Sequence, residues 1–256
     1  MSETKTTNRI TAALIKAWLP LSLVAVWAVG STAAPSPFFP PLRIILERFW
    51  TVWLGEGFVE HVLPSLLNLA IGFAIALVIG IAAGSLLALM PTAALLANPF
   101  LQFLRAMPSI ALLPVALVLF GTGMEARVAL IAYGAIWPIL LNTTDGITSI
   151  HPGVRQATRS YRFTRANTYF RVLLPGSFPQ ISLGIRLSLS IALVLMIGSE
   201  FYGAINGIGA YVLQSQLMFR TADMWSGVIL LGLLGYLLST GYGYVEDRLL
   251  RWREPS

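Results

Sequence analysis

Five arginines lie between residues 155 and 171, and three of them recur at helical spacing. Arg155, Arg159 and Arg162 stand at positions i, i+4 and i+7, and Pro152 suits the first turn of a short helix. Such a cationic helix can lie on anionic lipid headgroups, or it can dock into a groove on a cytoplasmic partner. The charge pattern alone leaves both interpretations open.

The chain carries none of the residue patterns of an enzyme or a metal protein. It has no cysteine, which excludes disulfides, iron–sulfur clusters and thiolate metal sites. Its two histidines, His61 and His151, argue against a histidine-based metal site. Neither a G-x-x-x-x-G-K-[ST] phosphate loop nor a G-x-S-x-G nucleophile motif occurs. We therefore expect no catalytic residue, no metal and no cofactor bound by this chain.

Composition places the chain in a membrane. Of its 256 residues, 56% are hydrophobic and only 11% are charged, and the mean hydropathy is +0.75. Soluble domains carry about 25% charged residues, so this chain has too few to cover a water-facing surface. A soluble enzyme, a disordered chain and a disulfide scaffold are excluded. The sequence predicts an all-α polytopic membrane protein.

Six apolar segments are long enough to cross a bilayer as helices, which takes about 20 residues each. None alternates with a period of two, so a barrel is excluded, and helices then satisfy the backbone polar groups. The first segment also resembles a cleavable signal peptide, although we favour a retained helix. The predicted spans are residues 14–34, 61–90, 98–121, 127–147, 180–203 and 224–244.

The basic residues orient these spans. Eleven of the 17 Lys and Arg residues lie before or in the first turn of the first span, in the 148–179 loop or after the last span. The positive-inside rule therefore places both termini and that loop in the cytoplasm. The net charge of +6 then reflects topology, and no nucleic-acid partner is expected. On the opposite side, residues 38–60 show apolar residues at helical spacing, which predicts an amphipathic helix on the outer membrane surface.

The second span carries a strip of small residues, each four positions from the next: Gly72, Ala76, Gly80 and Gly84. They share one helix face and allow another helix to approach closely. The approaching helix can belong to the same chain or to a second subunit, and the pattern does not choose between these.

Polar residues inside the spans are candidates for the translocation path. Pro108 and Pro114 interrupt the third span, where Arg105 either attracts anions or serves as a structural, snorkelling side chain. Glu200, at the outer end of the fifth span, either lines a gate or pairs with a basic residue. Residues 206–223 predict a short outer helix that caps the route. The predicted path or gate residues are Arg105, Glu200, Asn206, Tyr211 and Met218.

Three segments together resemble a known family. The stretch QATRSYR at 156–162, followed nine residues later by VLLP at 172–175, is similar to the E-A-A-x-x-x-G-x(9)-I-x-L-P signature of ABC importer permeases. The segment LRAMPSIALLP at 104–114 and the NGIG turn at 206–209 resemble the nitrate/sulfonate/taurine branch. The resemblance covers about residues 38–254.

This resemblance implies a six-helix type I importer permease, with a leading segment 1–37 and a permease domain 38–256. It implies the bacterial inner membrane and transport of a small organic or inorganic anion by alternating access. Expected partners are two cytoplasmic ATPase subunits that bind ATP and Mg²⁺, a second permease copy (the same chain or a different one), a periplasmic or lipid-anchored binding protein and membrane lipid. The alternative function is an ion-coupled carrier or channel without an ATPase.

In the family the 148–179 loop forms a coupling helix that docks on the ATPase. Carried over by position and charge, the expected contact residues are Arg155, Gln156, Ala157, Thr158, Arg159 and Arg162. The family Glu is Gln156 here, and the family Gly is Arg162, at a turn where a positive φ costs a non-glycine residue about 1–2 kcal/mol. Either the turn is built differently, or the ATPase partner has diverged, or a second permease chain keeps the family sequence.

Overall fold

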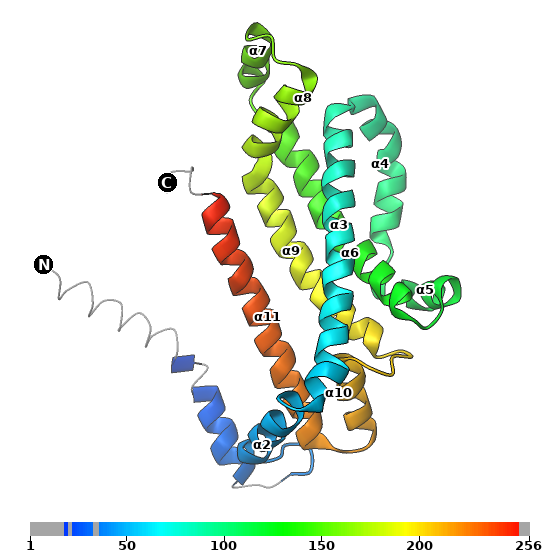
Figure 1. Cartoon of the computed structure of the whole chain (residues 1–256), viewed down its shortest axis with the longest axis vertical. Coiled ribbons are helices and arrows are strands. Elements are labelled where there is room, and N and C mark those ends of the chain that lie inside the picture. The colour runs from blue at the N-terminus through cyan, green and yellow to red at the C-terminus, as the bar shows by residue number, and fades with distance from the viewer. Residues whose placement is uncertain (1–17, 20–21, 33–35, 251–256) are drawn as a thin grey trace, which may run out of the picture.

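A computed structural model describes residues 18–19, 22–32 and 36–250 (Figure 1). The described residues form helices joined by turns, with one isolated β-bridge between Ser36 and Phe39. The all-α prediction is confirmed.

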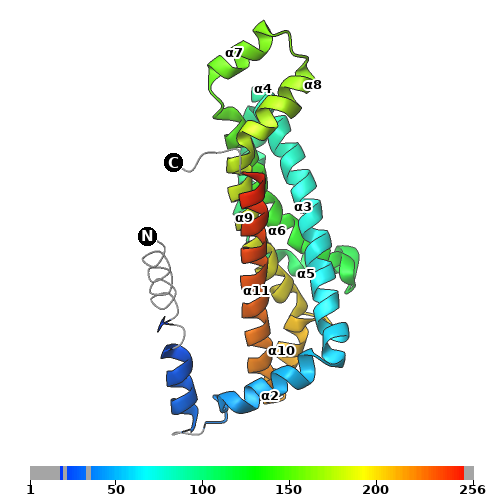
Figure 2. The ribbon, with the colours of Figure 1, turned by 60° about the vertical axis from the view of Figure 1, so that its left-hand side comes forward.

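Within the described residues, four continuous helices are long and apolar enough to cross a membrane. The first joins η1 (Phe58–Val62) to α3 (Leu63–Leu89), and the second is α6 (Met124–Thr148). The third joins α8 (Arg165–Thr168), η3 (Tyr169–Leu173) and α9 (Leu174–Glu200), and the fourth is α11 (Thr221–Leu249). These helices run along the long axis of the molecule (Figures 1 and 2).

The predicted first span, residues 14–34, lies partly outside the described residues. Its described part contains a shorter apolar helix, Ser22–Thr32. The count of six spans is therefore not tested here.

The third predicted span, 98–121, is interrupted at Pro108, as its prolines predicted. The structure has α4 (Pro91–Ala106), then η2 (Ser109–Leu112) and α5 (Leu113–Phe120), bent by 84° at the break between them. Met107, at the break, is extended (φ −72°, ψ 125°). The residue before a proline disfavours helical geometry, and Pro108 lacks an N–H, so the chain turns here. The bent pair makes a fifth span if it crosses as one unit.

The fifth span begins earlier than expected, because Pro175 and Pro179 do not stop the helix. Helical backbone runs from Arg165 to Glu200. Pro175 falls in the first turn of α9, directly after the wider π-helical turn Tyr169–Leu173, and Pro179 lies within α9. Local π geometry and neighbouring helices accommodate prolines in membrane helices. The segment between the long helices is correspondingly shorter than 148–179, because α6 ends at Thr148 and α8 begins at Arg165.

The core forms where α3, α6 and α9 pack together, with buried residues such as Leu69, Ile139 and Met196 between them. The small-residue strip of α3 faces α6 in this chain. A Cβ atom added to Gly84 would lie 2.5 Å from the Leu140 carbonyl oxygen, and one added to Gly72 would lie 2.7 Å from Ile131. The strip of small residues therefore lets α3 pack closely against α6 of the same chain.

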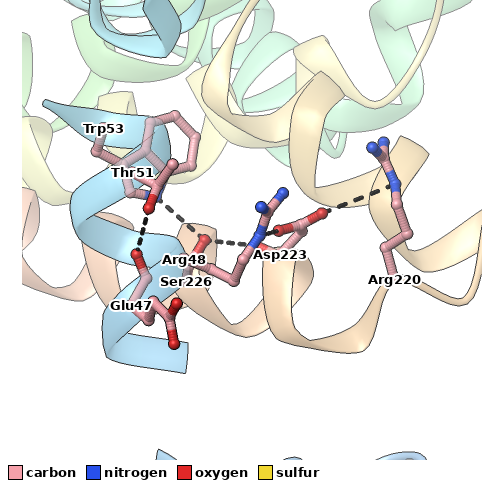
Figure 3. A network of polar contacts seen from close by, with 7 residues as sticks. All are labelled: Glu47, Arg48, Thr51, Trp53, Arg220, Asp223 and Ser226. Carbon is pink, nitrogen blue, oxygen red and sulfur yellow. Dashed lines mark hydrogen bonds and ion pairs between the residues drawn. The ribbon is translucent and has the colours of Figure 1, made fainter. Parts of the chain in front are cut away.

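At the end of the bundle opposite α7 (Pro152–Ser160), α2 (Leu42–Trp53) lies across the beginning of α11 (Figure 2). Arg48 Nε donates to Asp223 Oδ1 at 2.5 Å, and Trp53 Nε1 donates to Ser226 Oγ at 3.2 Å (Figure 3). The hydrogen bond and the negative charge of Asp223 raise the pKa of the Arg48 guanidinium above its usual value. Within the predicted 38–60 segment, α2 covers Leu42–Trp53, and an ion pair and a buried tryptophan fix it to α11.

Two further polar contacts join α9 to α11. Arg186 forms an ion pair with Glu246, and the hydroxyls of Ser182 and Tyr242 are 2.7 Å apart. Arg186 is a charged residue within the apolar helix α9, and the interhelical salt bridge gives its charge a partner.

Candidate functional site

The helix α7 stands at one end of the molecule, beyond the ends of the long helices (Figures 1 and 2). Its first turn follows from the sequence: His151 Nδ1 accepts a hydrogen bond from the Gly153 N–H at 3.1 Å, and Pro152 opens the helix. A turn with Arg162 then reverses the chain toward α8, so that α7 is held between α6 and α9.

Two of the predicted contact residues face inward. Arg155 Nη2 donates to the Ile147 carbonyl oxygen at 2.7 Å, near the C-terminus of α6. Thr158 is buried, and its hydroxyl donates to the Arg155 carbonyl oxygen at 2.8 Å. Arg155 therefore fixes α7 to the end of α6, whereas the hydrogen bond of the Thr158 hydroxyl stays within α7.

The other predicted contact residues on α7, Gln156, Ala157 and Arg159, are exposed. Val154 and Tyr161, which are 41% and 77% exposed, lie three residues before and four residues after Ala157. Residues at these spacings share one face of a helix. The helix therefore presents an exposed apolar stripe, which suits a groove on a protein, while Arg159 is exposed on another face of α7.

The turn after α7 keeps the geometry that glycine favours. Arg162 has φ +53°. The Phe163 N–H donates to the Thr158 carbonyl oxygen and the Arg162 N–H to that of Arg159, both at 3.0 Å. These are the paired bonds of a helix end closed by a left-handed residue. Of the alternatives left open by the sequence, a differently built turn is wrong: Arg162 adopts the strained conformation itself.

Contacts below α7 connect its base to three long helices. The hydroxyls of Ser85 on α3 and Tyr169 on η3 are 2.7 Å apart. Ala88, Ile147 and Leu173 form a buried apolar cluster from α3, α6 and η3. The hydrogen bond from Arg155 to the Ile147 carbonyl oxygen therefore joins α7 to the place where α3, α6 and η3 pack together.

Arg105 lies away from α7, in the last turn of α4, where it lines a cavity of about 520 Å³. Asp145 and Trp137 of α6 line the same cavity, and Trp137 Nε1 is buried without a hydrogen-bond partner among the described residues. The cavity offers a cation, a carboxylate and an indole N–H to a solute.

Glu200 is buried at the opposite end of the molecule from α7, and both of its carboxylate oxygens have partners. Oε1 accepts from Ser65 Oγ at 2.6 Å, and Oε2 accepts from the Gly209 N–H at 2.8 Å. Ser65 Oγ in turn accepts from the Ile208 N–H at 2.9 Å. Glu200 and Ser65 thus bind the first backbone N–H groups of α10 (Ile208–Leu217), where a negative charge is favourable.

The remaining predicted path residues do not form one cluster. Tyr211 is buried, with its ring centroid 4.9 Å from that of Trp53, whereas Asn206 and Met218 are exposed on either side of α10. Of these residues, Glu200 and Tyr211 come together at α10: Glu200 binds its first turn, and Tyr211 belongs to it. Arg105 lines a separate cavity. Ser65 was missed, because a single serine in an apolar span carries no distinguishing signal.

Comparison with known proteins identifies this architecture. Residues 76–251 match the model of the family described as binding-protein-dependent transport system inner membrane component. The chain belongs to this family of ABC importer permeases. The permease is 30% identical to a Bacillus subtilis protein named as an aliphatic sulfonates transport permease, SsuC, over 92% of this chain and 86% of the relative. It is 27% identical to the taurine transport system permease protein TauC of Escherichia coli, over 91% of this chain and 87% of the relative.

The permease also has the fold of solved transporter subunits. A chain of the MetNI methionine ABC transporter matches it with a TM-score of 0.66 and 22% identity, covering 77% of this chain and 97% of that chain. The type I importer permease fold is confirmed. The permease is a multi-pass component of the inner membrane and a transport subunit of the nitrate/sulfonate/taurine branch.

Proposed function

We propose that this permease pairs with a second permease subunit and that α7 of each copy docks on one of two cytoplasmic ATPase subunits. ATP binding closes the ATPases, which moves α7 and turns the path from inward to outward access; hydrolysis on the ATPases then resets it. The permease itself catalyses no reaction. A binding protein delivers the solute at the opposite end, near α2 and α10.

The observation that carries this proposal is the construction of α7. It projects beyond the bundle, presents an exposed apolar stripe, and is fixed to the end of α6 by Arg155. A helix that merely covered lipid headgroups would not need such an attachment. A rigid attachment is what a moving partner requires to transmit its motion.

The proposed solute is a small anion. Relatives are named for aliphatic sulfonates, taurine, bicarbonate and nitrate. These solutes all carry an oxyanion, so the shared chemistry is recognition of a compact negatively charged group. The orientation follows from the arginine-rich side, which places α7 and the C-terminal end of α11 in the cytoplasm.

Cross-linking tests the docking, and the absence of natural cysteine makes it direct. We expect Ala157→Cys to cross-link to a cysteine placed in the groove of the ATPase within the assembled transporter. The matched control is Thr158→Cys, the next residue, which is buried at 7% exposure and is therefore shielded from a cross-linking partner. Equal cross-linking of both variants, or of neither, would contradict the proposed docking face.

A further inference from the structure

A second cavity, of about 360 Å³, opens at the end of the molecule opposite α7. It lies between the first turns of α3, the turn before α6 and the turn between α9 and α10. Its polar lining consists of Asn68, Thr122, Arg127 and Asn206. None of these side chains is acidic, so the cavity is lined by one positive charge and uncharged polar groups.

The Arg127 guanidinium is available to a ligand. One of its nitrogens, Nη2, donates to the Thr122 carbonyl oxygen at 3.2 Å, and none of the ion pairs among the described residues includes Arg127. The nearby carboxylate of Glu200 attracts Arg127, but its two oxygens already accept from Ser65 and Gly209. The remaining donors of Arg127 suit an oxyanion, which guanidinium binds through parallel hydrogen bonds.

Asn68 supplies a second, independent indication. The residue is 3% exposed and lines the cavity, and none of the side-chain hydrogen bonds among the described residues involves its amide. An amide has two N–H donors and one carbonyl acceptor, so the Asn68 side chain keeps hydrogen-bonding capacity that a ligand in the cavity can use. Asn206 at the exposed rim adds another amide.

The rest of the lining is apolar and indicates that the ligand has a carbon chain. Leu63, Pro64, Leu67 and Met124 form this wall, and Ile205 lies at the rim. The volume falls in the range of about 300–1,000 Å³ that holds small organic ligands. An inorganic ion such as nitrate would leave the apolar wall without contact.

We propose that this cavity binds a small organic anion, with its sulfonate or carboxylate head on Arg127 and Asn68 and its short apolar chain against Leu67 and Met124. The inference rests on the proposed transport function, since it assigns the permease its own solute site on the delivery side. It makes the permease itself selective for organic over inorganic anions.

Binding of butane-1-sulfonate to the full-length permease in lipid nanodiscs, measured by calorimetry, tests the site. We expect Arg127→Gln to weaken binding at least tenfold and Arg127→Lys to weaken it less. Asn68→Asp, which keeps the side-chain shape and adds a negative charge, should abolish binding. Arg43→Gln is the matched control, because it removes an exposed arginine from α2 on the same side, and it should leave binding unchanged.

Three outcomes would overturn the site: no binding of butane-1-sulfonate to the unaltered permease, equal affinity in Arg127→Gln, or equal weakening by Arg43→Gln. Nitrate binding as tightly as butane-1-sulfonate would overturn the organic class. The Ala157→Cys cross-link separates the two proposals, because it reports docking of the ATPase whether or not this cavity holds a solute.

Discussion

Arg155 Nη2 donates a hydrogen bond of 2.7 Å to the Ile147 carbonyl oxygen. This carbonyl belongs to the last turn of α6, where backbone acceptors lack partners within the helix and a cation is favoured. Arg155 thus caps the C-terminal end of α6 and at the same time anchors α7 to it. The arginines at 155–171 are the most conspicuous feature of the sequence of this permease, and they therefore include residues with different tasks.

Arg155→Ala tests the anchoring task. A hydrogen bond from a charged donor contributes about 1.5–3 kcal/mol, so its loss should let α7 move relative to α6. We expect substrate-stimulated ATP hydrolysis of the assembled transporter to fall strongly, while the Ala157→Cys cross-link to the ATPase still forms.

Arg159→Ala is the matched control, because Arg159 is an exposed arginine one turn further along α7. Arg159→Ala should weaken docking of the ATPase and so reduce the Ala157→Cys cross-link. Arg155→Ala, in contrast, should leave the ATPase docked but lower its substrate-stimulated hydrolysis. The anchoring role is wrong if the two variants give the same combination of cross-linking and hydrolysis.

The turn at Arg162 predicts a gain from glycine. A non-glycine residue at φ +53° is strained by about 1–2 kcal/mol, which glycine relieves. Arg162→Gly should therefore slow hydrogen exchange of two backbone amides, those of residues 162 and 163, whose hydrogen bonds close the turn. Arg162→Ala removes the same charge but retains the strain, so it should bring no such protection. Equal exchange in the two variants would show that the arginine side chain, not the backbone, sets the stability of the turn.

The closeness of α3 and α6 predicts unequal effects of two glycine substitutions. Gly84→Ala places a methyl group 2.5 Å from a backbone oxygen of α6, which cannot move without shifting the helix. Overpacking of this kind costs about 1–3 kcal/mol. The control is Gly241→Ala in α11, which meets nothing within 4 Å and should be neutral or slightly stabilising. Thermal unfolding of the purified variants in detergent measures both, and equal midpoints would contradict the tight helix contact.

Ser65 offers a test of the buried network around Glu200. Ser65→Ala removes the acceptor of the Ile208 N–H and the donor to Glu200, and an unpaired buried group costs about 1–3 kcal/mol. Ser177→Ala is the control, since Ser177 is equally buried but donates only within its own helix, to the Leu174 carbonyl oxygen. We expect a lower unfolding temperature for Ser65→Ala alone. A similar loss in both variants would mean that buried serines in general, rather than this network, support the fold.

Much of the secondary structure of this permease could be predicted from its sequence, because the patterns that indicate it are local. Long apolar runs define the membrane helices, a proline and arginines at helical spacing define α7, and Met107-Pro108 lies where the third span breaks. The strip of small residues on α3 predicted a close helix contact, although not which helix makes it. These features depend on backbone hydrogen bonding and helical periodicity, which operate over a few residues.

The tertiary structure alone decided which side chains meet. It turned Arg155 toward Ile147 and left Arg159 exposed, paired Arg186 with Glu246, and enclosed Glu200 with Ser65, which is 135 positions away. It also carried the helix of α9 through Pro175, against the local expectation. Such pairings depend on the register and rotation of helices that are distant in sequence, and those are set by packing rather than by residue type or spacing.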